Sequence, residues 1–116
     1  MSEIIYKITL REAWERAVRA GEFLGAPIDV QDGYIHFSSP DQVIETAKKH
    51  FSGQSDLMLV AIDSVRLGGA LKWEPSRGGA LFPHLYGPLP MDVVLSAIPL
   101  PLGPDGTHLF PDEVGL

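Results

Sequence analysis

The sequence predicts a small α+β domain in which two N-terminal helices accompany a small antiparallel or mixed β-sheet. Only two segments, both in the first half of the chain, have the spacing of amphipathic helices, and the strand-like segments are joined by long connections rather than by alternating helices. The 116 residues, 45% hydrophobic and 21% charged, have the composition of one globular unit. We therefore expect residues 1–116 to form a single domain, with residues 103–116 as a loose hairpin or tail.

The first predicted elements are a strand and a helix. β-branched and aromatic residues favour a strand over residues 3–8, and Thr9 and Glu12 then have the spacing of a capping box. Gly21 is the residue expected to end the helix in a left-handed conformation. Between these signals, apolar residues recur at the spacing of one helix face, namely Leu10, Ala13, Trp14, Ala17 and Val18.

The second helix is expected to start with Ser39 as N-cap and to end before Gly53, after a turn at residues 32–33 and a short strand at residues 34–37. Residues 57–62 are apolar at successive positions, which predicts a central strand covered on both faces. Further strands are predicted at residues 71–74 and 93–100. The glycine- and proline-rich stretch 75–90 is expected to be irregular.

Composition excludes several classes of function. Nine Lys and Arg against 15 Asp and Glu give a net charge of −6, which argues against general nucleic-acid binding. The absence of cysteine excludes disulfides, thiolate metal sites and cysteine nucleophiles. With no apolar run long enough to cross a membrane and no basic, apolar leader at the start, the expected location is the cytoplasm.

The loop-rich segment 71–90 holds the largest group of candidate site residues: Trp73, Glu74, Arg77, His84 and Tyr86. Two glycines, at positions 78 and 79, predict a mobile tip at residues 76–80, so that this segment is expected to act as a flap over a site. Burial of Trp73 and of the run 82–86 is expected to anchor its two ends. The alternative is that these aromatic side chains only close the end of a small core.

His36 and Ser38 form the second candidate group, because they lie just before a predicted helix N-terminus, where backbone N–H groups favour an anion. We expect His36 and His84 to lie close together. The alternative for His36 is a hydrogen-bonded core histidine. The four histidines do not have the spacing of a zinc motif, so no metal is expected.

These segments also carry a resemblance. IIYKI at residues 4–8, DGYIHFSSPDQVIETAKKHF at 32–51, DLMLVAID at 56–63 and KWEPSRGGALFPHLYGPLP at 72–90 resemble the bacterial domain-of-unknown-function family 952. That family is in turn distantly similar to the ADP-ribosyltransferase fold, whose split antiparallel sheet holds NAD in a cleft. The resemblance implies that His36 and Ser38 line the nicotinamide or ribose side of the cleft, with Tyr6 or Lys7 on the first strand.

Two kinds of function follow from the resemblance. As an NAD-dependent transferase, the chain would use Glu74 to stabilise the cationic transition state, His36 to hold the ribose or diphosphate, Arg77 to pair with a phosphate, and Trp73 or Tyr86 to stack on a ring. As a non-catalytic module, it would bind a small anionic or nucleotide-like ligand through Arg77, His36 and His84. A protein-interaction role for the proline-rich half, with an unidentified partner, also stays open.

Overall fold

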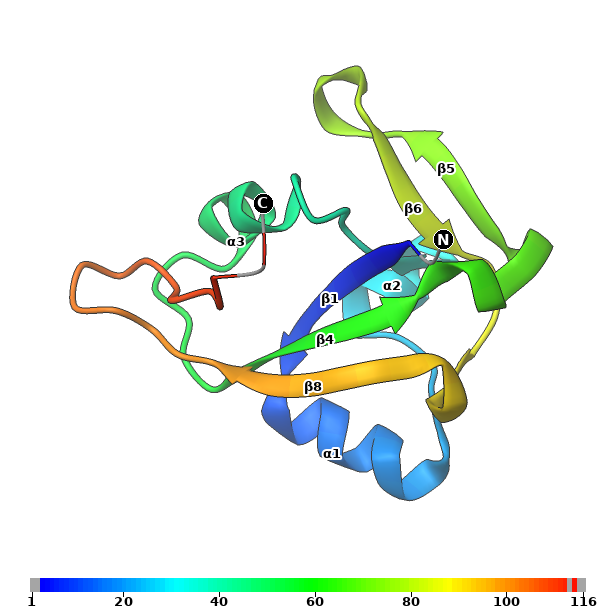
Figure 1. The fold of residues 1–116 in the computed structure, drawn as a ribbon, viewed down its shortest axis with the longest axis horizontal. Coiled ribbons are helices and arrows are strands. Elements are labelled where there is room, and N and C mark those ends of the chain that lie inside the picture. Colours follow the sequence, from blue (N-terminus) through cyan, green and yellow to red (C-terminus); the bar gives the residue numbers. More distant parts are fainter. Residues whose placement is uncertain (1–2, 113, 115–116) are drawn as a thin grey trace.

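The computed structural model describes residues 3–112 and 114, without the side chain of Arg77. Its centre is formed by two three-stranded antiparallel sheets with the strand orders β1-β4-β8 and β3-β6-β5 (Figure 1). The predicted α+β class with antiparallel sheets and few helices is confirmed. The strands of the two sheets are β1 (Ile4–Leu10), β4 (Leu57–Asp63), β8 (Val94–Leu100), β3 (Ile35–His36), β6 (Leu81–Leu85) and β5 (Leu71–Pro75).

Strand β4 is the centre of the first sheet and is covered on both faces, as its continuous apolar run predicted. Leu57, Leu59 and Ala61 pack against α3 (Val43–His50). The alternate residues Val60 and Ile62 pack on the opposite face in the cluster that includes α1 (Arg11–Ala20). The two helices therefore shield opposite faces of one sheet, since alternate side chains of a strand point to opposite sides.

The ends of the two predicted helices agree only in part with the sequence signals. Gly21 ends α1 with a φ of 89°, as predicted. The capping box at its start is wrong: Leu10 is the N-cap without a side-chain bond, and Thr9 is buried as the last but one residue of β1. The helix α3 begins at Val43, four residues after the predicted N-cap Ser39.

A third helix, α2 (Pro27–Asp32), occupies a segment for which the sequence predicted no helix. Gly33, expected in a simple turn, ends this helix with a φ of 88°. The helix has six residues, too few for a hydrophobic period to be visible in the sequence. One of its residues, Asp29, is a carboxylate that is only 1% exposed.

The expectation of an irregular segment at residues 75–90 is wrong. It contains β6, the centre of the second sheet, and β7 (Leu89–Pro90), which pairs with β2 (Glu22–Phe23). Pro83 lies inside β6 opposite Trp73 of β5, and its carbonyl accepts a hydrogen bond from the Phe37 amide. Proline has no N–H to donate, but its carbonyl can still accept. The ladder of hydrogen bonds therefore loses one donor at this position and keeps the acceptor.

The two sheets meet at one isolated bridge. The Tyr6 amide donates to the Ser38 carbonyl at 2.8 Å, and the Ser38 amide donates to the Tyr6 carbonyl at 2.9 Å. Away from this bridge, the edge of β1 and the β5–β6 hairpin diverge, and α3 lies opposite the hairpin (Figure 1). Side chains from all three elements line the pocket described below.

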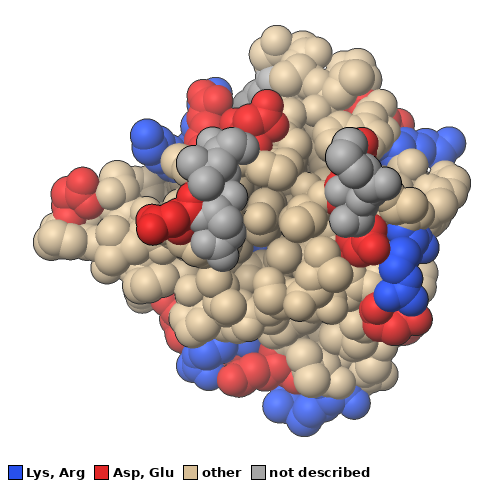
Figure 2. All heavy atoms as spheres, viewed as in Figure 1, with Lys and Arg blue, Asp and Glu red and all other residues tan. Residues whose placement is uncertain are grey.

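The remaining segments are short or loosely structured. Single-turn 3-10 segments flank the strands at Arg77–Gly79 and Met91–Val93, and a longer one covers Ser64–Ala70. Residues 102–108 form a loose hairpin closed by a bridge between Leu102 and His108. On the face shown in Figure 2, the acidic and basic side chains lie mostly around the periphery. Among the described residues, no helix has the length and apolar character needed to span a membrane.

The double coverage of β4 predicts where the chain is most sensitive to truncation. Ile62 is 0% exposed, so Ile62→Ala removes buried methylene groups and leaves a cavity, which costs about 2–5 kcal/mol. Ile98→Ala on β8 is the matched control, because that side chain is 37% exposed. Urea unfolding followed by circular dichroism should show a much larger loss for Ile62→Ala; equal losses would contradict the described core.

Candidate functional site

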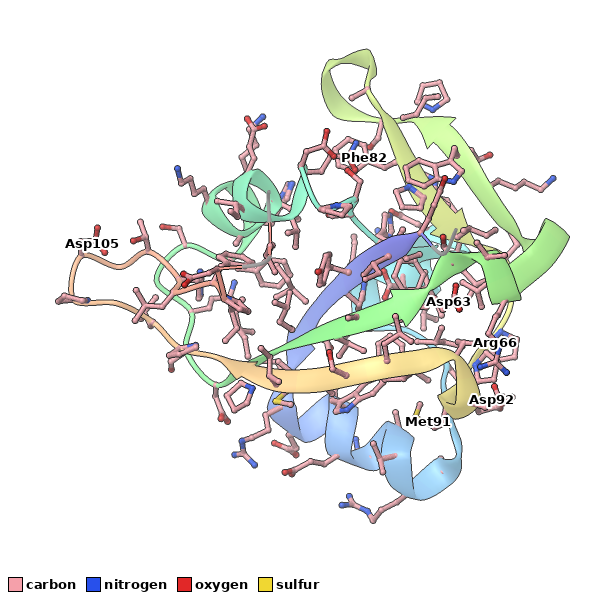
Figure 3. The ribbon with its side chains drawn as sticks, viewed as in Figure 1. Asp63, Arg66, Phe82, Met91, Asp92 and Asp105 are labelled. Carbon is pink, nitrogen blue, oxygen red and sulfur yellow. The ribbon has the colours of Figure 1, made fainter. Side chains whose placement is uncertain are left out.

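A pocket of about 650 Å³ lies between the edge of β1, helix α3 and the β5–β6 hairpin. Figure 3 shows the labelled side chain of Phe82, one of its walls, on the side of the hairpin toward α3. Three of the predicted site residues line it: His36, Ser38 and His84. The other lining residues are Tyr6, Lys7, Ile8, Ile28, Asp32, Phe37, Gln42, Glu45, Thr46, Lys49, His50, Phe51, Ser76, Gly78, Ala80 and Phe82.

The pocket lining differs in charge and ring content from the chain as a whole. Asp32 and Glu45 are its acidic residues, whereas its basic or protonatable residues are Lys7, Lys49, His36, His50 and His84. Counted in the same way, with its four histidines added to nine Lys and Arg, the whole chain has 13 basic or protonatable residues against 15 acidic ones, so the pocket is enriched in protonatable side chains. The apolar walls are rich in rings, from Tyr6, Phe37, Phe51 and Phe82.

His36 and His84 lie side by side, which confirms the expectation for this pair. They are directly opposite each other in the pairing of β3 with β6, and their ring centroids are 5.5 Å apart. The ring of Tyr34 stacks on His84 at 4.2 Å and lies 4.7 Å from His36. The two histidines are 48 positions apart in sequence. The backbone register therefore brings both imidazoles to one point of the pocket.

A buried ionic network holds His36 from behind. Lys7 Nζ lies 2.8 and 3.0 Å from the two oxygens of Asp29 and donates to the His36 carbonyl at 2.9 Å. Asp29 also accepts from the Ala26 amide at 2.7 Å and from the His36 amide at 3.1 Å. Every donor of the lysine ammonium is thereby used, so this amine is a structural group rather than a free nucleophile.

Burial and charge act in opposite directions on this pair. Burial alone raises the pKa of Asp29, but the hydrogen bond from His36 and the charge of Lys7 outweigh it, and the pKa falls to about 2. Burial lowers the pKa of Lys7, against the attraction of Asp29. An ionised Asp29 therefore stabilises the fold fully above its ordinary pKa of 3.8, and this contribution disappears as the pH falls toward about 2.

Both ring nitrogens of His36 face carboxylates. Nδ1 lies 2.6 Å from Asp29 Oδ1, and Nε2 lies 3.0 Å from Asp32 Oδ2. Asp29 is buried, whereas the Asp32 side chain is 37% exposed and lines the pocket. Because an ionised carboxylate only accepts hydrogen bonds, whichever nitrogen of His36 carries a hydrogen has an acceptor in place.

His84 is held by a separate carboxylate on β5. Its Nδ1 lies 2.9 Å from Glu74 Oε1, which also accepts from the Tyr86 hydroxyl at 2.7 Å. The hydrogen bonds from Tyr86 and then His84 lower the pKa of Glu74, and Glu74 in turn raises the pKa of Tyr86 to about 12. The Glu74 side chain is 35% exposed and is paired with both His84 and Tyr86.

Glu74, Trp73 and Tyr86 do not line the pocket among the described residues. The expected burial of Trp73 and Tyr86 at the ends of the hairpin is wrong, since they are 40% and 43% exposed. Instead, the buried residues of the returning strand are Pro83, His84 and Leu85. The role predicted for Arg77 depends on its side chain, which lies outside the described part of the structure.

The hairpin tip reaches the pocket, as a flap would. Ser76, Gly78 and Ala80 line the pocket, and the Ser76 amide donates to the Ala80 carbonyl at 3.0 Å. Gly78 and Gly79 both have positive φ, of 72° and 81°. Motion of this tip is a prediction that the structure does not test.

Gln42 ties the hairpin to the start of α3. Its Nε2 donates to the Leu81 carbonyl at 2.7 Å, and its Oε1 accepts from the Ser39 amide at 3.0 Å. Next to it, the hydroxyl groups of Ser38 and Thr46 are 2.9 Å apart. Sequence reasoning missed Gln42, the N-cap of α3, and Thr46 within α3 as pocket residues, because both look like ordinary polar positions of a helix.

A metal centre is not evident in the described part of the chain, where no three His, Asp or Glu side chains are grouped as ligands. The carboxylates nearest the histidines are already occupied: Asp29 binds Lys7, and Glu74 binds Tyr86. The polar groups left for a ligand are the second ring nitrogen of His84, the Asp32 carboxylate and the hydroxyl groups of Ser38 and Thr46. These groups suit an organic molecule that needs both donors and acceptors.

Comparison with known proteins places this chain in a family. The model of the family described as "Protein of unknown function (DUF952)" matches residues 8–97. This chain belongs to that family. No curated protein matches the chain.

Solved structures similar to this family member come from Caulobacter crescentus. The crystal structure of protein CC0527 has 46% sequence identity and a TM-score of 0.92, over 97% of this chain and 99% of that one. The solution NMR structure of CC0527 has 48% identity and a TM-score of 0.81, over 90% of each chain. The fold described above is therefore similar to experimental structures over nearly its whole length.

The Asp29 network predicts an acid-sensitive step in stability. Asp29→Asn leaves the buried Lys7 without its counter-charge and should cost about 3 kcal/mol at pH 7. The wild type should lose this advantage as the pH falls from about 4 to about 2, because the pKa of Asp29 lies at about 2 in the folded chain. Urea unfolding at several pH values measures both effects. Asp32→Asn, on the same helix but more exposed, is the control, and an equal loss there would contradict the role of Asp29.

The Gln42 contact predicts a second measurable effect. Gln42→Ala removes the side-chain bond to the Leu81 carbonyl, so the hairpin tip should open more often while the sheets stay intact. Hydrogen exchange at residues 76–80 should become faster, with no change in β4. Gln54→Ala, which removes a side-chain bond to the His50 carbonyl, is the matched control. Unchanged exchange at the tip would show that Gln42 does not restrain it.

Proposed function

We propose that the pocket binds a small anionic, nucleotide-like molecule, with NAD as the first candidate, and that the chain transfers a group from it. The observation that carries this proposal is the concentration of protonatable and aromatic side chains in one pocket of a chain with a net charge of −6. Three of the four histidines line it. Its volume of about 650 Å³ lies within the range of small-molecule sites, about 300–1,000 Å³.

The pocket walls match the parts of such a ligand. The rings of Phe37, Phe51 and Phe82 offer apolar faces on which a nicotinamide or adenine ring can pack. On the polar side, His36 and Ser38 would hold the ribose or diphosphate, as the resemblance to the ADP-ribosyltransferase fold implies. Lys49 adds a positive charge at the α3 wall, where its bond to Glu45 is exposed and easily exchanged for a phosphate.

The transfer reaction needs a carboxylate near the developing cation. When nicotinamide leaves the ribose carbon, positive charge builds up there, and a nearby anion stabilises it. Asp32 is the carboxylate in position for this, since it lines the pocket beside His36. Glu74, the candidate from the sequence, faces His84 and Tyr86 instead. The proposal therefore moves this role from Glu74 to Asp32.

Binding should be visible as stabilisation by the ligand. A ligand that binds only the folded chain, present at a hundred times its Kd, stabilises it by about 2.7 kcal/mol. We expect the melting temperature to rise with NAD or ADP-ribose, in a concentration-dependent way, and not with adenine alone. Release of nicotinamide, measured by chromatography after incubation with NAD, separates a transferase from a module that only binds.

A variant that fills the pocket gives the specific control. Ala80→Trp places a large side chain at the exposed rim, where Ala80 lines the pocket, without disturbing the core. It should abolish the ligand-induced rise in melting temperature. Ala20→Trp, at the exposed end of α1, should leave that rise intact. An identical ligand response in both variants would place binding elsewhere, and no response in the wild type would refute the nucleotide proposal.

A further inference from the structure

The two histidines of the pocket differ in where their hydrogens lie. His84 is only 2% exposed and contacts Glu74 through Nδ1 at 2.9 Å. An ionised carboxylate accepts and never donates, so Nδ1 must carry the hydrogen of this bond. The Tyr86 hydroxyl, which donates to the same oxygen at 2.7 Å, favours the ionised form of Glu74.

The other nitrogen of His84 is then an acceptor. In the part of the chain that the structure describes, Nε2 has no hydrogen-bond partner. No fully buried side-chain nitrogen or oxygen there lacks a partner, so Nε2 must keep some exposed surface. His84 lines the pocket, so the pocket is where Nε2 has its remaining access. Tyr34, stacked on the ring at 4.2 Å, restricts rotation of the imidazole.

His36 has the complementary arrangement. Its nitrogens face Asp29 at 2.6 Å and Asp32 at 3.0 Å, so it donates to a carboxylate from the ring edge and leaves neither nitrogen free as an acceptor. A donor histidine and an acceptor histidine therefore lie with their ring centroids 5.5 Å apart. The carboxylates around the two rings therefore differ in number, with two at His36 and one at His84, so a second nitrogen is left for a ligand only on His84.

We propose that His84 is the proton acceptor of the pocket and that Glu74 is the positioning residue that fixes the tautomer in which Nε2 presents its lone pair. This inference deepens the proposed function and rests on it for the identity of the reaction. It names the second substrate by class: a molecule with a hydroxyl group that can donate to Nε2.

The proton and electron movements balance without a further reagent. As the hydroxyl oxygen forms its bond to the ribose carbon of NAD, its proton passes to His84 Nε2. The bond from that carbon to the nicotinamide nitrogen breaks, and the electron pair leaves with nicotinamide. The imidazolium formed on His84 is stabilised by Glu74, in the way a buried carboxylate stabilises a catalytic histidine.

The test is the tautomer of His84, read from ring nitrogen shifts by NMR on the full chain labelled with 15N-histidine. In the wild type at neutral pH, the spectrum should show hydrogen on Nδ1 and none on Nε2. Glu74→Met keeps the side-chain length but removes the acceptor, so a population with hydrogen on Nε2 should appear. Tyr86→Phe is the control, because Glu74 stays bonded to His84 and the tautomer should not change.

A chemical probe gives a second reading of the same lone pair. Diethyl pyrocarbonate acylates an unprotonated imidazole nitrogen: the nitrogen bonds to a carbonyl carbon and ethyl carbonate leaves. Peptide masses should show faster modification of His84 in the wild type than in Glu74→Met, by about tenfold if the tautomer preference is about 1.4 kcal/mol.

The outcomes are distinct. A wild-type His84 with hydrogen on Nε2, a tautomer unchanged in Glu74→Met, or an unreactive His84 would each overturn the inference. Neither measurement uses a nucleotide, so failure of NAD to bind would refute the proposed function while the tautomer result stood. Conversely, NAD binding with the wrong tautomer would remove His84 as proton acceptor and leave the ligand proposal intact.

Discussion

The buried contact between Lys7 and Asp29 is the interaction on which the rest of the site depends. It joins β1 to α2, and through the His36 carbonyl and amide it joins both to β3. A helix of six residues is too short to be stable alone, so α2 depends on such tertiary contacts. Removing either charge would leave the other unpaired inside the protein, which is why the network holds together as a unit.

The same contact determines the chemistry that the pocket can offer. Asp29 uses its oxygens to hold Lys7, the His36 backbone and the His36 ring at once. The second histidine depends on a different element, since Glu74 comes from β5 at the edge of the other sheet. The two imidazoles are therefore positioned independently, although the pairing of β3 with β6 brings them side by side in an edge-to-face arrangement. This independence allows one to donate and the other to accept.

Sequence patterns predicted the elements with a long hydrophobic period and missed the short or proline-containing ones. The continuous apolar run of β4 and the helical spacing of apolar residues in α1 were sufficient to predict these two elements, because each buries a regular set of side chains. Helix α2 was hidden by its length, and β6 by Pro83, whose carbonyl still accepts a hydrogen bond from the Phe37 amide. A count of proline and glycine describes the backbone freedom of an isolated peptide. Whether such a residue can join a strand depends instead on which backbone amides the sheet needs as hydrogen-bond donors.

The sequence predicted that certain residues lie together at the site, but not which side chains they bind. His36 and His84 were expected together, and the structure places them so. The role of Glu74 could not be read from its neighbours in sequence, because it depends on register. Glu74 pairs with Phe82, and two positions on, His84 presents its ring on the same face of the sheet. Nothing in the sequence marked Asp29 as buried, because a single acidic residue near a proline is typical of an exposed position.

The strand order β1-β4-β8 has a consequence for how the chain is made. No two neighbours in this sheet are consecutive along the chain, because helices, the hairpin and the second sheet all intervene. Its third strand ends at Leu100, 37 residues beyond the end of β4 at Asp63. During synthesis, β1 and β4 can meet early, but the sheet is completed only after Leu100 has left the ribosome. Until then, one edge of β4 stays unpaired, and the growing chain has to be kept from pairing that edge with other molecules.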